Sequence, residues 1–153
     1  MKPGNGAEET PHEAQPVTIY TFGYVGRSPS ELETEARRLA ADVLDVRFRP
    51  ASQDPRWNGA ALQGLPGYRW VQGFGNKNYR GGPIELKAYP AGLSVVREIL
   101  KAGRTVILLC MCADVKVCHR KVVAEKLATD LRVQVEHLGR APKPKPRTLF
   151  DEL

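Results

Sequence analysis

The feature that most constrains the fold is a nearly continuous apolar run at residues 104–110, RTVILLC. Such a run is typical of a strand buried on both faces, as happens where helices cover a parallel sheet. Helical patterns flank it along the chain, at residues 91–102 and 118–131. The run therefore predicts the central strand of an α/β domain.

Strands and helices alternate through the rest of residues 17–139. Residues 28–40 open with a capping box, because Pro29 follows Ser28 directly and Glu31 stands three positions after it. Further strands are predicted at 17–22, 43–48, 68–72 and 133–138. This alternation favours one three-layer α/β/α domain over 17–139, Rossmann-like, with a mainly parallel sheet of about five strands.

The two ends of the chain differ from this middle part in composition. Residues 1–16 are rich in Gly, Pro and Glu, which predicts a disordered N-terminal segment. Residues 140–153, RAPKPKPRTLFDEL, alternate Pro with basic residues and predict an extended basic tail. Leu149 and Phe150 in that tail either dock on a partner protein or pack back onto the domain.

Charge indicates the kind of partner, and the cysteines indicate the compartment. The net charge is +6, and it resides in residues 17–139 because the two ends carry −2 and +2. This balance favours a phosphate-bearing ligand or a nucleic acid, although a solvated basic surface explains it too. Three clustered cysteines, no export signal and no membrane-spanning run predict a cytoplasmic protein without a membrane partner.

Candidate ligand groups gather where the predicted strands end. In a parallel α/β sheet, ligands bind beyond the carboxyl ends of the strands. Asp45, Arg47 and Arg49 alternate at the end of the second strand, so they share one face or a common edge where the strand ends. Asp45 either satisfies the two guanidiniums as a surface ion pair or orients them toward a bound phosphate, and we assign it a catalytic role.

Two glycine-containing segments supply further candidates. GYVGRS, with Tyr24 and Arg27, opens onto a helix N-terminus, where anions bind. GNKNYRGG, with Asn78, Tyr79 and Arg80, is suited to cradle an anion or to close over a pocket. Aromatic and basic residues alternate between positions 48 and 80, the combination that binds nucleotides or single strands; packing of a long loop is the alternative.

The stretch LLCMCADVKVCHR holds all three cysteines. Cys118 begins the predicted last helix beside His119 and Arg120, a position that lowers a thiol pKa and suits a nucleophile. We therefore take Cys118 and His119 as catalytic candidates, and Cys110 and Arg120 as ligand-binding ones. Metal binding is the rival interpretation, but the spacing C-x-C-x5-C-H differs from standard zinc motifs, so we expect no metal and no cofactor. Cys110 is alternatively an inert core residue.

Taken together, the segments TFGYVGRS, DVRFRP, GFGNKNYRGG and LLCMCADVKVCHR resemble domain-of-unknown-function family 488, a family of bacterial and archaeal proteins of about this size. The resemblance covers residues 18–138 and implies an α/β fold with a site at these loops, without a settled reaction. The family typically has His where this chain has Tyr24, and often Glu at the position of Cys112.

Rhodanese-like sulfurtransferases are similar in outline, through Asp45-Val46-Arg47 and a Cys that ends the central strand. From the basic charge and the candidate residues at the strand ends, we expect an enzyme or binding protein for a phosphate-bearing, nucleic-acid-related ligand. The alternatives are a sulfurtransferase that uses Cys110 and a non-catalytic nucleic-acid-binding module.

Overall fold

The computed structural model describes residues 17–112 and 118–139, so the predicted N-terminal segment and basic tail lie outside the described residues. The predicted order of elements is confirmed: β1 (Thr18–Gly23), α1 (Pro29–Leu39), β2 (Ala41–Asp45), β3 (Arg69–Trp70), α2 (Tyr89–Lys101), β4 (Thr105–Cys110), α3 (His119–Leu131) and β5 (Gln134–Leu138). No helix within the described ranges has the length and apolar character needed to cross a membrane.

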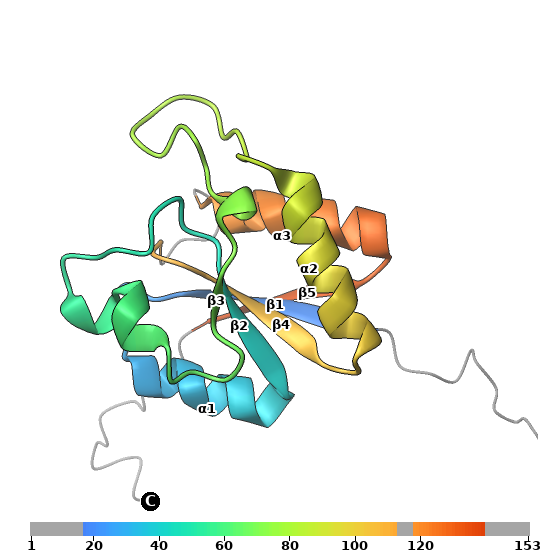
Figure 1. Ribbon diagram of the computed structural model, residues 1–153, viewed down its shortest axis with the longest axis horizontal. Helices are drawn as coiled ribbons and strands as arrows, with labels where there is room; N and C mark the ends of the chain where they lie inside the picture. The colour runs from blue at the N-terminus through green and yellow to red at the C-terminus, as the bar shows by residue number, and fades with distance from the viewer. Residues whose placement is uncertain (1–16, 113–117, 140–153) are drawn as a thin grey trace, which may run out of the picture.

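The five strands form one parallel sheet in the order β3-β2-β4-β1-β5. Helix α1 covers one face, and α2 and α3 cover the other, so the molecule has three layers (Figure 1). The apolar run that begins at Thr105 is β4, and it lies in the middle of the sheet between β2 and β1. This confirms the predicted α/β class and the central position of that strand.

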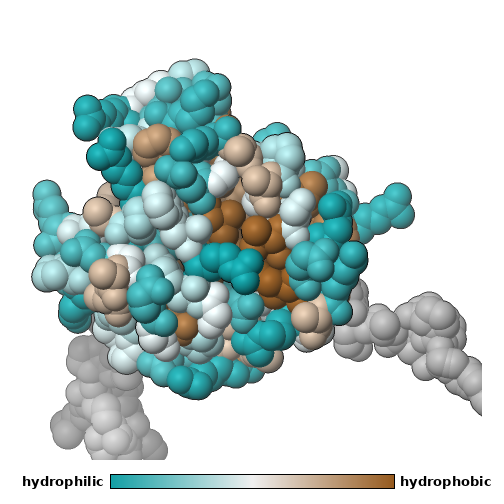
Figure 2. Space-filling model, viewed as in Figure 1, coloured by the Kyte–Doolittle hydropathy of each residue, from teal (hydrophilic) through white to brown (hydrophobic). Residues whose placement is uncertain are grey.

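Strand β4 contributes side chains to two separate hydrophobic cores. Val106, Leu108 and Cys110 pack in the core beneath α2 and α3, whereas Ile107 and Leu109 pack in the core beneath α1. Successive side chains of a strand point to opposite faces, so a continuous apolar run is what a strand between two helical layers requires. Apolar side chains also show at the surface in the middle of one face, beside α2 and within a polar surround (Figure 2).

The start of β2 differs from the prediction of 43–48. Helix α1 begins with the predicted capping box at Ser28 and ends at Leu39. The left-handed backbone (φ 53°) of its C-cap residue, Ala40, turns the chain directly into Ala41. The two residues before Val43 therefore already belong to the strand. After Asp45 the chain makes one more bond to β4, from Val46 N–H to the Leu109 carbonyl, and then leaves the sheet.

Strand β3 is also shorter than the predicted 68–72. Its backbone follows β2 only at Arg69 and Trp70, and the chain then turns through a short 3-10 segment, Gln72–Phe74. That turn drives the Phe74 ring beneath α2 at Gly92, where an added Cβ would lie 2.3 Å from the ring. The close approach of ring and helix explains the glycine at this helical position.

Candidate functional site

One cavity lies at the carboxyl ends of β1, β2 and β4, where the loops after these strands meet α3. Its volume is about 410 Å³, and its lining residues come from five separate segments: Tyr24, Arg47, Phe48, Arg49, Ala51, Asn76, Tyr79, Ile84, Cys110, Met111, Cys112 and His119. We call this the main cavity. Six of the predicted site residues line it: Tyr24, Arg47, Arg49, Tyr79, Cys110 and His119. None of the lining residues carries a carboxylate.

The Asp45 carboxylate is fully buried and holds the Arg47 guanidinium in place. Arg47 donates from Nε to Asp45 Oδ1 at 2.8 Å and from Nη2 to Oδ2 at 2.5 Å. The Tyr68 hydroxyl donates to the same Oδ2 at 2.6 Å, and the Arg47 backbone N–H donates to Oδ1 at 3.2 Å. The Asp45 carboxylate therefore accepts four hydrogen bonds within the protein, and the two from the Arg47 side chain fix the orientation of that guanidinium. The catalytic role assigned to Asp45 stays a prediction.

Arg47 is itself buried, with one edge toward the main cavity. Burial acts to lower the pKa of Arg47, but hydrogen bonding and charge pairing with Asp45 outweigh it and raise that pKa above its usual value. Its Nη1 makes two long contacts, each 3.4 Å, to the Tyr24 hydroxyl and the Ala51 carbonyl. Tyr24 is fixed in turn by stacking on buried Trp57, with ring centroids 4.6 Å apart. The guanidinium is thus a permanent, oriented cation at the cavity wall.

The rim of the main cavity is aromatic and basic. Phe48 and Tyr79 stack at a centroid distance of 5.3 Å, although 31 positions separate them in the chain. Lys87 lies over the Phe48 ring at 5.8 Å, and Arg80 lies over the Tyr79 ring at 5.5 Å. The exposed Arg49 guanidinium makes no hydrogen bond or ion pair within the described residues.

Residues 76–86 form a loop that stands out from the three layers (Figure 1). An antiparallel bridge joins Asn76 to Leu86 at its base, and the Asn76 side-chain oxygen accepts two backbone N–H groups. The Asn78 amide donates to the Pro83 carbonyl inside the loop, so it shapes the loop and does not line the cavity. Of the three candidates from this segment, only Tyr79 lines the main cavity, and Arg80 lies outside it.

The floor of the main cavity carries a thiol and an imidazole. Cys110 ends β4, and its Sγ lies 3.6 Å from Nδ1 of His119, the first residue of α3. The other ring nitrogen, Nε2, lies 2.6 Å from the Val46 carbonyl oxygen. A carbonyl only accepts, so Nε2 carries a hydrogen and Nδ1 faces the sulfur. Cys118 is the N-cap residue of α3 and is almost completely buried behind this pair.

The three thiols influence one another's protonation. Hydrogen bonds to Cys112 and Cys118, together with burial, raise the pKa of Cys110. The same Cys110 hydrogen bonds lower the pKa of Cys112 and, more strongly, that of Cys118. Burial acts to lower the pKa of His119, but its contacts with Cys118 and with the Val46 carbonyl raise it overall. The hydrogen bonds of the cluster thus shift proton affinity toward Cys110 and away from Cys112 and Cys118.

Arg27 and Arg120 lie apart from the main cavity. Both are buried and line a recess of about 480 Å³ between the ends of β1 and β5. Arg120 donates to the Thr21 hydroxyl at 3.2 Å and to the Cys112 carbonyl, and Arg27 donates to the Leu138 carbonyl at 2.8 Å. Arg120, near the start of α3, thus donates to oxygen atoms of the protein itself, and it lines a different recess from Arg47.

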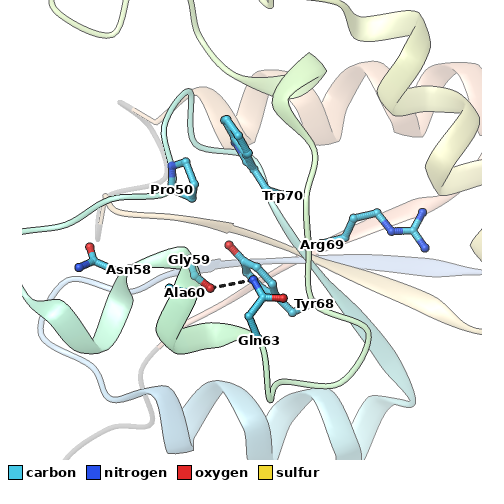
Figure 3. A pocket seen from close by; sticks show the side chains of 8 residues that line it. All are labelled: Pro50, Asn58, Gly59, Ala60, Gln63, Tyr68, Arg69 and Trp70. Atoms are coloured by element: carbon cyan, nitrogen blue, oxygen red, sulfur yellow. Dashed lines mark hydrogen bonds between the residues drawn. The ribbon is translucent and has the colours of Figure 1, made fainter.

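A third recess, of about 510 Å³, lies between β3 and the two 3-10 turns that follow β2. Figure 3 shows Tyr68 and Gln63 on one side of it and Arg69 extending away from them. The Gln63 amide donates to the Gly59 carbonyl at 2.9 Å. No thiol, imidazole or carboxylate is among its lining residues, so the main cavity is the better candidate site despite its smaller volume.

Several residues in and around the main cavity could not be predicted from the sequence. Ile84 and Met111 are lone apolar residues in loops, and no periodic pattern marks them. The Val46 carbonyl is a backbone group, which looks the same at every position of a sequence. The aromatic and basic stretch between positions 48 and 80 does not predict that Phe48 stacks on Tyr79 at the rim of the cavity. Nor does it predict that Tyr68, which lies outside the cavity, donates to Asp45.

The family model Domain of unknown function DUF488 matches residues 32–127, which is more than half of the chain. The chain therefore belongs to the DUF488 family. No curated protein and no solved structure matches it. The matched range includes β2, the loop 76–86, β4 and most of α3, so it covers most of the main cavity.

Proposed function

We propose that the protein binds a phosphate-bearing, nucleic-acid-related ligand, an aromatic base joined to phosphate, in the main cavity. The observation that carries this proposal is the combination of two arginines and a stacked aromatic pair on a wall without carboxylates. Arginine binds phosphate oxygens through paired N–H donors, and aromatic rings stack on bases. A cationic wall with no acidic residue favours an anion.

Arg47 and Arg49 have different roles in the proposed binding. Arg47 is held by Asp45 before any ligand arrives, so little conformational freedom is lost when its Nη1 turns from long contacts to a phosphate oxygen. Arg49 is exposed at the rim and supplies charge that attracts an anion from solution. Tyr79 and Phe48 offer the stacking surface beside them.

The alternative of a sulfurtransferase that uses Cys110 has less support. A persulfide forms on a nucleophilic thiolate, whereas the hydrogen bonds and burial around Cys110 raise its pKa. The catalytic roles assigned to Cys118 and His119 stay predictions, and Cys118 does not line the main cavity.

Binding can be tested by fluorescence anisotropy with a labelled single-stranded oligonucleotide, and by calorimetry with a nucleoside monophosphate, at low salt. We expect saturable binding that Arg49→Gln weakens about 10-fold, the loss of one charge-assisted phosphate contact. Tyr79→Ala should weaken it by about 5- to 100-fold through lost stacking. The slope of log K against log salt should fall by about 1 for Arg49→Gln.

Arg37→Gln is the matched control, since Arg37 is an exposed arginine on α1 that pairs with Glu33. It changes the net charge equally but should leave the affinity unchanged. Absence of saturable binding to both probes would refute the proposal. So would equal losses for Arg37→Gln and Arg49→Gln, because that result would indicate attraction to overall charge and not to a site.

A further inference from the structure

Three potential metal ligands meet at the floor of the main cavity. The sulfur atoms of Cys110 and Cys118 and a ring nitrogen of His119 all lie within 4.8 Å of one another. Cys110 comes from the end of β4, and the other two come from the start of α3. Thiolate and imidazole are the ligands that zinc prefers in proteins.

The orientation of His119 suits a metal ligand. Its Nε2 donates to the Val46 carbonyl at 2.6 Å, so a neutral ring presents the lone pair of Nδ1 to the Cys110 sulfur. Histidine ligands usually donate their other ring N–H to a carboxylate or a backbone carbonyl, which fixes the ring and its tautomer. The carbonyl of Val46, the residue directly after β2, is such an acceptor for His119.

The separation of the ligand atoms also agrees with a metal centre. In a tetrahedral zinc site, bonds of about 2.3 Å to sulfur and about 2.0 Å to nitrogen place those two atoms about 3.5 Å apart. The distance from Cys110 Sγ to His119 Nδ1 is 3.6 Å. A thiol–imidazole hydrogen bond has a similar length, so the distance allows both interpretations and measurement of metal uptake must separate them.

We propose that Cys110, Cys118 and His119 are three ligands of a zinc site whose fourth position faces the main cavity beside Cys112. Two thiolates neutralise the charge of Zn²⁺, so the buried centre has no net charge. Cys112 and His119 line the cavity, which leaves the fourth position open to water or to a ligand. This proposal revises the expectation from the spacing C-x-C-x5-C-H, because the fold, and not a short motif, brings the ligands together.

Metal uptake by the full chain tests the proposal directly. The protein is stripped with a chelator under reducing conditions, loaded with Zn²⁺ or Co²⁺, desalted and assayed for metal content and for thiolate-to-cobalt absorption. We expect one equivalent of metal, a thiolate charge-transfer band and a rise in the midpoint of thermal unfolding on zinc addition. Substoichiometric metal without a charge-transfer band would overturn the proposal.

Variants then assign the ligands. Loss of a group that only hydrogen-bonds to a metal ligand weakens metal binding by roughly 10- to 100-fold. Loss of a ligand itself should weaken zinc binding by more than this, in each of the variants Cys110→Ser, Cys118→Ser and His119→Gln. Cys112→Ser is the matched control and should still bind one equivalent, because water can take the fourth position. Loss of metal from Cys112→Ser equal to that from Cys110→Ser would overturn the assignment. Zinc uptake is measured without nucleotide, so this result is independent of the function proposed above.

Discussion

Replacing Asp45 with Asn should destabilise the protein strongly, because it leaves the buried Arg47 guanidinium without its counter-charge. Asp45 is fully buried, Arg47 has 6% of its side chain exposed, and two hydrogen bonds join the two groups. The amide of Asn matches the shape of the carboxylate but carries no charge and offers one oxygen in place of two. The variant therefore retains the cation and loses what compensates it.

The size of the effect follows from this burial. Breaking a buried ion pair by removing one partner costs about 3–5 kcal/mol, since the remaining charge stays desolvated. This is a large part of the roughly 5–15 kcal/mol that stabilises a typical domain. Tyr68→Phe should cost less, about 1.5 kcal/mol, because it removes one hydrogen bond to a charged acceptor and leaves the ion pair intact.

Urea unfolding followed by circular dichroism measures these differences. With a slope of about 2 kcal/mol/M, a loss of 4 kcal/mol, roughly, lowers the midpoint by about 2 M. Asp54→Asn is the control, because Asp54 forms an exposed ion pair with Arg56, and it should leave the midpoint unchanged.

A double variant tests the reasoning itself. Adding Arg47→Met to Asp45→Asn removes the uncompensated cation and should recover part of the lost stability. If the double variant is less stable than Asp45→Asn alone, the guanidinium is not the source of the cost, and the account of this ion pair is wrong.

Three further predictions concern other parts of the fold. Gly92→Ala should destabilise the protein by about 1–3 kcal/mol in urea unfolding, because the new methyl group meets the Phe74 ring, whereas an unhindered helix would gain up to about 1 kcal/mol; a gain would contradict the close packing. Ser28→Ala should cost about 1 kcal/mol by removing the cap of α1, and no loss would contradict the capping box. Burial and the Arg120 charge lower the pKa of His137, so its stabilising contribution is complete above pH 6.5, roughly, and is lost as the pH falls toward the lower folded value. His137→Gln should flatten this dependence, and an NMR titration with a normal or raised pKa for His137 would refute it.

Much of the fold could be predicted from local patterns. The apolar run of β4 and the capping box at Ser28 each depend on neighbouring residues, and both predicted elements are present. The ends of β2 and β3 could not be predicted in the same way. They depend on the left-handed turn at Ala40 and on the register between β2 and β3, which are set by contacts between distant segments.

The candidate site shows the same division. Alternation along a strand is a local rule, and it predicted that Asp45 and Arg47 share a face, as the bonds between them require. The direction of the Arg120 side chain depends on two acceptors outside α3, the Thr21 hydroxyl and the Cys112 carbonyl. No sequence pattern around α3 indicates these acceptors. The same is true of Asn78, whose amide is used inside its own loop.

The alternation of β4 between the two cores has a consequence for how this chain can vary. Even-numbered residues of the strand, from Val106 to Cys110, serve the α2–α3 layer, and odd-numbered ones serve the α1 layer. Deleting one residue between them would exchange these assignments and carry the Cys110 thiol to the opposite side of the sheet, away from His119. Exchange of one branched aliphatic residue for another leaves the thiol where it is. The side of the sheet on which the thiol lies therefore depends on the number of residues in the strand. A one-residue deletion is more damaging to the site than a conservative substitution.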